Sequence, residues 1–136
     1  MPVIRRTDAR RTETPNAVMT TYASPTQGST SLAMWHVDMV AGAQGPLHAM
    51  DTEQIWTLAT GTAAVDLAGE TVALAAGDTL VLPAGLTRQI TTDTGFTAVV
   101  ASPSPSRAYN PDARTPEGAC DLAPRDDQRV LPAWIA

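Results

Sequence analysis

The sequence predicts an all-β protein, built as a sandwich or barrel of short strands. Apolar and polar residues alternate in several runs of five to ten residues, and Gly and Pro separate these runs. Both faces of the first run carry bulky side chains, which is typical of a strand between two sheets. A chain of 136 residues is long enough for one domain with one core.

Residues 1–30 are polar and rich in Thr, Ser and Pro, and they predict an N-terminal arm. Its apolar patch at residues 17–19 could become a strand. Residues 31–40 alternate as a strand does. One face would carry Leu32, Met34, His36 and Asp38, and the other Ala33, Trp35, Val37 and Met39.

The middle of the chain supplies most of the expected strands. Residues 54–59 predict a strand with Gln54, Trp56 and Leu58 on one side. Further strands are expected at residues 63–67, 70–74, 78–82, 87–92 and 96–101, and Ala68-Gly69 indicates a hairpin turn between the first two of these.

The last part of the chain has a different composition. Six of the eleven prolines lie in residues 102–136, so an extended tail is expected there rather than a long helix. Its end is apolar again, and Trp134 is expected to dock on the barrel. The prediction is therefore an arm at 1–30, a barrel core at 31–101 and a docking tail at 102–136.

Composition narrows the classes of partner. The net charge of −5 and the pI near 4.7 argue against a nucleic-acid partner, which needs clustered positive charge. The sequence shows no run of eighteen apolar residues and no hydrophobic signal-peptide region, so neither membrane association nor export is expected. Cys120 is the one cysteine, which excludes an internal disulfide and suits a reducing compartment. We expect a cytoplasmic protein.

Two spaced motifs stand in the middle of the chain. The first has Gly42 or Gly45, then His48, Met50, Gln54 and Gly61. The second has Gly77, Pro83, Gly85, Arg88 and Thr92. This pattern resembles the cupin superfamily, in particular its small single-domain members of the quercetin-dioxygenase-like type. The resemblance implies a jelly-roll barrel, or double-stranded β-helix.

The resemblance also implies a metal site in which three of the four usual ligands are replaced. His48 matches the first ligand, whereas Met50, Gln54 and Arg88 stand at the positions of a His, a Glu and a second His. First-row divalent metals prefer imidazole and carboxylate donors, and a permanently charged guanidinium repels them. We therefore expect a degenerate site with no metal and no cofactor.

In this fold the motif residues point into the barrel. The expected catalytic pair is His48 as a neutral base and Arg88 as a cation that stabilises negative charge. The expected ligand-binding residues are Met34, His36, Met50, Gln54, Trp56 and Ile90, of which Met34 and His36 rest on strand alternation alone. In the alternative, Asp38, Asp51 or Glu53 neutralises Arg88, and His48 belongs to a filled core.

The predicted function is binding of a small molecule without a metal. Proton abstraction could follow, with isomerisation, cyclisation or elimination of a partly apolar, anionic or enolisable substrate. The alternatives are a non-catalytic binding or sensor protein and a metal-dependent oxygenase with unusual ligands. The resemblance further implies a homodimer joined through the N-terminal arm.

Overall fold

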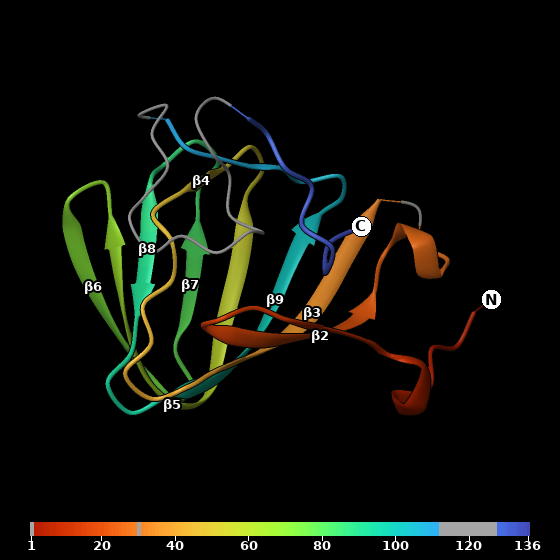
Figure 1. The fold of residues 1–136 in the computed structure, drawn as a ribbon, viewed down its shortest axis with the longest axis horizontal. Helices are drawn as coiled ribbons and strands as arrows, with labels where there is room; N and C mark the ends of the chain where they lie inside the picture. Colours follow the sequence, from red (N-terminus) through yellow and green to blue (C-terminus); the bar gives the residue numbers. More distant parts are fainter. Residues whose placement is uncertain (1, 30, 112–127) are drawn as a thin grey trace.

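The computed structural model describes residues 2–29, 31–111 and 128–136. Cys120 and the middle of the expected tail lie outside these residues. The described residues form ten strands and two short 3₁₀ helices, which confirms the all-β prediction (Figure 1). The strands are β1 Arg10–Glu13, β2 Ala17–Ala23, β3 Leu32–Met39, β4 Ala49–Met50, β5 Gln54–Leu67, β6 Glu70–Ala75, β7 Thr79–Leu82, β8 Arg88–Thr91, β9 Phe96–Pro103 and β10 Ala108–Tyr109. The helices are η1 Arg6–Asp8 and η2 Pro25–Gln27.

The strands form an eight-stranded antiparallel sheet that bends at β5 and packs around an apolar core. Its order is β1-β2-β3-β9-β5-β6, with β7 and β8 also paired to β5. Strands β4 and β10 form a separate pair. In Figure 1, β6 and β8 lie opposite β2 and β3, and β5 pairs with strands on both sides, so the barrel interior lies between these two walls.

Strand β5 joins the two walls of the barrel. The runs predicted at 54–59 and 63–67 are one strand, whose register shifts between Leu58 and Thr60. Gly61 follows this bulge with φ +78°, and a Cβ atom there would lie 2.0 Å from the carbonyl oxygen of Gly95. Only Gly fits at this close approach, which accounts for the last residue of the first motif.

Strand β3 has the predicted alternation, but its inward face is the other one. Ala33, Trp35 and Val37 are at most 4% exposed, whereas Met34 is 45% exposed. His36 packs against Tyr22 on the outer surface of the sheet, with ring centroids 6.4 Å apart. The prediction that Met34 and His36 line the barrel cavity is wrong, because the larger apolar face of the strand turns inward.

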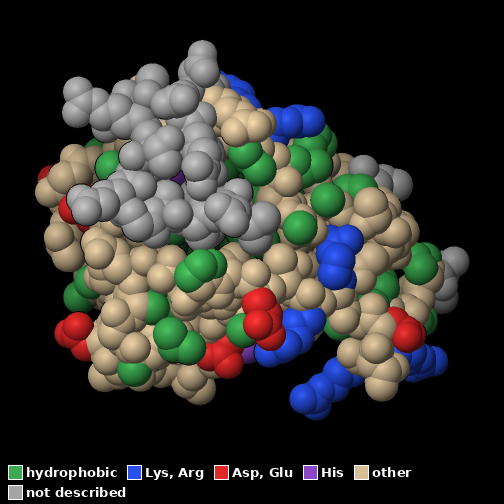
Figure 2. Space-filling view, in the orientation of Figure 1, with side chains coloured by type: hydrophobic (Ala, Val, Ile, Leu, Met, Phe, Trp, Pro, Cys, Tyr) green, Lys and Arg blue, Asp and Glu red, His purple; other side chains and the backbone are tan. Residues whose placement is uncertain are grey.

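The N-terminal segment is more ordered than the predicted arm. Strands β1 and β2 form a hairpin, and β2 pairs along β3 of the same chain. Arg side chains gather on the side of these strands in Figure 2, while acidic side chains lie mostly toward the other side.

Among the described residues, no helix has the length and apolar character needed to cross a membrane.

Candidate functional site

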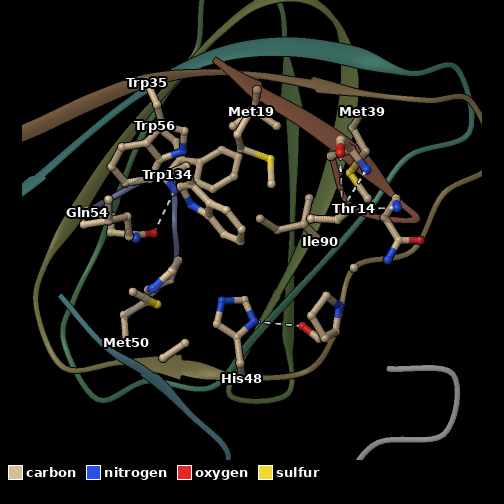
Figure 3. A pocket seen from close by; sticks show the side chains of 18 residues that line it. Thr14, Met19, Trp35, Met39, His48, Met50, Gln54, Trp56, Ile90 and Trp134 are labelled. Atoms are coloured by element: carbon tan, nitrogen blue, oxygen red, sulfur yellow. Dashed lines mark hydrogen bonds between the residues drawn. The ribbon is translucent and has the colours of Figure 1, made fainter. Parts of the chain in front are cut away.

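An apolar cavity of about 130 Å³ lies inside the barrel. Strands β2, β3, β5 and β8 supply its walls, and the segment at residues 132–135 lines it together with the β1–β2 turn (Figure 3). All three tryptophans of the chain, Trp35, Trp56 and Trp134, line it. An apolar cavity of about 150 Å³ can hold benzene, so this space matches a molecule of roughly one aromatic ring.

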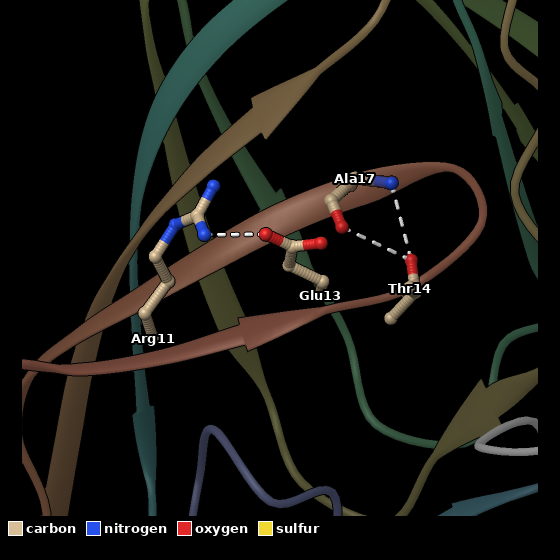
Figure 4. A network of polar contacts seen from close by, with 4 residues as sticks. All are labelled: Arg11, Glu13, Thr14 and Ala17. Atoms are coloured by element: carbon tan, nitrogen blue, oxygen red, sulfur yellow. Dashed lines mark hydrogen bonds and ion pairs between the residues drawn. The ribbon is translucent and has the colours of Figure 1, made fainter.

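The β1–β2 turn is fixed by its own hydrogen bonds at the rim of the cavity (Figure 4). The amide of Thr14 donates to the carbonyl of Ala17 at 2.9 Å. The Thr14 hydroxyl accepts from the amides of Asn16 and Ala17 at 3.3 and 3.1 Å. Arg11 pairs with Glu13 on the adjoining strand. The rim formed by residues 14–17 is therefore preorganised.

The C-terminal segment is anchored across the barrel from two sides. Thr21 Oγ1 donates to the carbonyl of Trp134 at 2.8 Å, and Ser104 Oγ donates to that of Ile135 at 2.9 Å. Val130 exchanges backbone hydrogen bonds with Ala108 at 2.8 and 2.9 Å. The indole of Trp134 is held in the cavity as a result (Figure 3).

His48 reaches the cavity from the loop before β4. Its amide donates to the carbonyl of Arg88 at 3.0 Å, and the Arg88 amide donates back to the carbonyl of His48 at 2.7 Å. The Nδ1 atom lies 2.8 Å from the carbonyl oxygen of Pro46. Figure 3 shows the ring directed into the cavity. This backbone bridge and the Pro46 contact together fix the direction of the imidazole.

His48 is electrically neutral at physiological pH. Burial lowers its pKa from 6.5 to about 4, the hydrogen bond to Pro46 opposes the shift, and the nearby charge of Arg88 adds to it. A carbonyl oxygen cannot donate, so Nδ1 carries the proton and donates to Pro46. Nε2 is thus left with a lone pair, and within the described residues the imidazole makes one hydrogen bond, that of Nδ1 to Pro46.

Gln54 supplies the second polar group of the cavity wall. Its side chain is 4% exposed, and its Oε1 atom accepts a hydrogen bond of 3.1 Å from the Trp56 indole nitrogen. This contact orients the amide and leaves its amino group as the remaining donor. Met50 and Ile90 complete the predicted wall, at 2% and 8% exposure.

Arg88 is fully buried but does not line this cavity. Its Nη2 atom donates to the carbonyls of Pro83 and Leu86 at 2.8 and 3.1 Å, and Nε donates to Leu86 at 3.3 Å. Nη1 is buried without a hydrogen-bond partner among the described residues. Burial lowers the pKa of Arg88 to about 10, an effect that nearby Tyr109 opposes, so the group stays charged at neutral pH.

The carboxylates considered as partners of Arg88 lie elsewhere. Asp51 accepts from the Arg107 amide at 2.7 Å and lies 3.9 Å from Arg129. Asp38 and Glu53 are exposed. Among the described residues the guanidinium is therefore bound by loop carbonyls, which identifies Arg88 as an anchor of the loop between β7 and β8.

The structure brings together five of the eight predicted site residues. His48, Met50, Gln54, Trp56 and Ile90 line the cavity, whereas Met34, His36 and Arg88 do not. The sequence prediction missed Met19, Val37, Met39 and Trp134 as wall residues. The inward face of β3 could have been found by comparing the bulk of its two faces.

The residues at the metal-ligand positions do not fit a divalent metal. They offer one imidazole, one thioether and one amide, and the fourth position is a guanidinium turned toward backbone carbonyls. Within the described part of the chain, no three His, Cys, Asp or Glu residues are grouped closely enough to hold an ion. This donor set has a single imidazole and no carboxylate, whereas such metals prefer several of these groups together.

Comparison with known proteins identifies the fold. No protein-family model matches the sequence, and no similar sequence was found among curated proteins. Solved structures do match. Salicylate 1,2-dioxygenase from Pseudoaminobacter salicylatoxidans, solved as adducts with gentisate, has a TM-score of 0.63 and 24% identity over 71% of this chain. The polyketide cyclase RemF from Streptomyces resistomycificus has a TM-score of 0.66 and 16% identity over 78% of this chain and 83% of its own.

An RmlC-like cupin from Shewanella frigidimarina has a TM-score of 0.65 and 17% identity, over 74% of this chain and 88% of its own. The protein thus has the cupin fold, as the two motifs predicted. The match to salicylate 1,2-dioxygenase covers 27% of that protein's length. At these levels of identity the similarity defines the architecture alone.

Proposed function

We propose that this protein binds a small, largely apolar molecule in the barrel cavity without a metal, and that His48 accepts a hydrogen bond from it. The observation that carries the proposal is the neutral imidazole of His48, whose Nε2 atom has no partner within the described residues and belongs to an apolar cavity of about 130 Å³. Cavities lined by apolar and aromatic groups with a few placed polar atoms are typical ligand sites. A structural neighbour solved with gentisate is consistent with this use of the fold.

Binding is better supported than proton abstraction. A general base works best with a pKa near the operating pH, and the pKa of His48, about 4, makes it a weak base. The cation expected to stabilise an enolate, Arg88, is committed to the carbonyls of Pro83 and Leu86. The proposal is accordingly a non-catalytic binding protein, the second of the functions considered from the sequence.

Toluene titration tests the proposal, with intrinsic fluorescence as the readout because all three tryptophans line the cavity. We expect saturable quenching or enhancement in the parent protein. Val37→Phe should abolish it by filling the cavity, since Val37 is 4% exposed and lines the wall. The matched control is Val40→Phe, whose position is 56% exposed, and it should bind as the parent does. Equal binding by both variants would place the probe outside the cavity.

We also propose that two copies associate as a cytoplasmic homodimer. A row of outward side chains in register crosses the sheet from β3 to β7. It contains Met34, Ala101, Ile55 and Val81. Met34, Ile55 and Val81 are 45%, 42% and 51% exposed, and an exposed apolar row on a sheet face favours association.

A further inference from the structure

Two polar side chains of the cavity, His48 and Gln54, have defined roles as hydrogen-bond acceptor and donor. Because the Pro46 carbonyl can only accept, Nδ1 of His48 is the protonated nitrogen and Nε2 is an acceptor. Because the Trp56 indole donates to Oε1 of Gln54, the amino group of Gln54 is a donor. A hydroxyl group is the simplest ligand group that can both donate to one and accept from the other.

The described lining of the cavity carries no charge to meet an ionic ligand. None of the described residues that line it is Asp, Glu, Lys or Arg, and the imidazole is neutral because burial lowers its pKa to about 4. The guanidinium of Arg88 is bound to the carbonyls of Pro83 and Leu86. Transfer of a carboxylate or phenolate from water into such surroundings is strongly unfavourable. This differs from the anionic or enolisable substrate that the sequence suggested.

We propose that the ligand is a neutral hydroxyl compound about the size of one aromatic ring, of the phenol class, whose O–H donates to Nε2 of His48. This inference rests on the proposed binding function and specifies its ligand. The ring would occupy the apolar space among Trp56, Trp134 and Ile90, and the hydroxyl would lie toward His48 and Gln54. His48 is then the residue that determines specificity for a hydroxyl group.

Phenol, anisole, toluene and benzoate are the probes that test it. They share one ring, but among them phenol alone is a neutral donor at pH 7.5. Dissociation constants would be measured by fluorescence titration for the parent protein and for His48→Leu, which keeps an apolar wall but has no acceptor. We expect the ratio of phenol affinity to toluene affinity to fall at least about tenfold in His48→Leu, because the buried hydroxyl loses its partner. Anisole should behave like toluene in both proteins.

The outcomes separate this inference from the proposed function. If toluene binds and the phenol-to-toluene ratio is unchanged by His48→Leu, the cavity binds ligands but the hydroxyl assignment is wrong. Tighter binding of benzoate than of phenol would also overturn it. If none of the probes binds, both proposals fail.

A second measurement covers the case in which His48→Leu does not fold. In the parent protein, the ¹⁵N resonance of the His48 Nε2 atom should shift on addition of phenol and stay unchanged on addition of toluene. A resonance that responds equally to both probes would contradict a hydrogen bond from the hydroxyl.

Discussion

At His48, the stability of the fold and the proposed hydrogen bond to a ligand both depend on the protonation state of the imidazole. Its backbone bridge to Arg88 and the hydrogen bond from Nδ1 to Pro46 place the ring before any ligand is present. Burial then keeps the imidazole neutral, so the lone pair on Nε2 stays available across the physiological pH range. Protonation of Nε2 would remove the acceptor and also place a charge inside the barrel.

The stability of the protein should therefore depend on pH through His48. Its pKa is 6.5 when unperturbed and about 4 in the folded protein, so the unfolded chain binds the proton first as the pH falls. The free energy of unfolding should be unaffected above about pH 7 and should decrease between pH 6.5 and 4, by at most about 3 kcal/mol. Urea unfolding at several pH values would measure it. In His48→Leu the free energy of unfolding should fall less between pH 6.5 and 4, and the decrease that remains should be the part due to carboxylates. If the parent protein and His48→Leu gave the same dependence of this free energy on pH, burial of a neutral imidazole would be contradicted.

Arg88 should affect stability rather than binding. Arg88→Ala removes three hydrogen bonds to the carbonyls of Pro83 and Leu86 together with a fully buried side chain, so we expect a loss of about 2–4 kcal/mol. Chemical denaturation measures this loss, and toluene titration at low temperature tests the retained binding. Arg107→Ala, at an exposed position, is the matched control and should change stability by less than about 0.5 kcal/mol. If a folded Arg88→Ala protein lost toluene binding, Arg88 would belong to the ligand site and its assignment as a loop anchor would be wrong.

At the scale of elements, the segment at residues 130–136 sets the size of the cavity. Trp134 occupies space between the β-strands and is held by the hydrogen bond from Thr21 to its carbonyl rather than by its side chain alone. Trp134→Ala should therefore leave the backbone in place and enlarge the cavity. We expect it to gain measurable naphthalene binding that the parent protein lacks, at a cost of about 3 kcal/mol or more in stability.

Leu131→Ala is the control for this change, because Leu131 packs against the core from the same segment but does not line the cavity. It should exclude naphthalene as the parent does. Calorimetric or fluorescence titration would measure the binding of naphthalene and of toluene to Trp134→Ala, to Leu131→Ala and to the parent protein. Equal naphthalene binding by the parent protein would show that the segment does not limit ligand size.

The same elements show what the sequence can and cannot predict. Strands β3, β6, β7, β8 and β9 follow from alternation and from flanking Gly and Pro, because these signals are local. The inward face of β3 depends on which sheet covers it, so Met34 and His36 were assigned to the wrong side. Spacing placed Arg88 correctly on an inward strand position, yet the direction of its guanidinium depends on the Pro83 and Leu86 carbonyls, which no sequence pattern specifies. Trp134 is held at the site by Thr21, a residue more than one hundred positions away in the sequence, and no local pattern indicates such a contact.

For the whole molecule, the outward apolar row across β3, β9, β5 and β7 favours association of two copies. Its members are Met34, Ala101, Ile55 and Val81, in direct cross-strand register. Burial of such a row against a second copy would stabilise association by the hydrophobic effect, at about 25 cal/mol per Å² of apolar surface. The hairpin of β1 and β2 pairs with β3 of its own chain, so association of two copies would not require exchange of a strand.

A charge in the middle of this row should separate the two copies. We expect the parent protein to sediment as a dimer and Ile55→Asp to sediment as a monomer, because Ile55 is 42% exposed in the single chain and would become buried in the dimer, where an unpaired carboxylate is costly. Thr71→Asp, on exposed β6 outside the row, is the control and should remain dimeric. Sedimentation velocity over a tenfold range of concentration measures both states. A parent protein that is monomeric throughout would rule out the dimer, and a dimeric Ile55→Asp variant would place the interface on another surface. Toluene binding should persist in the monomer, since the apolar row lies on the outer face of the sheet and the cavity lies inside the barrel.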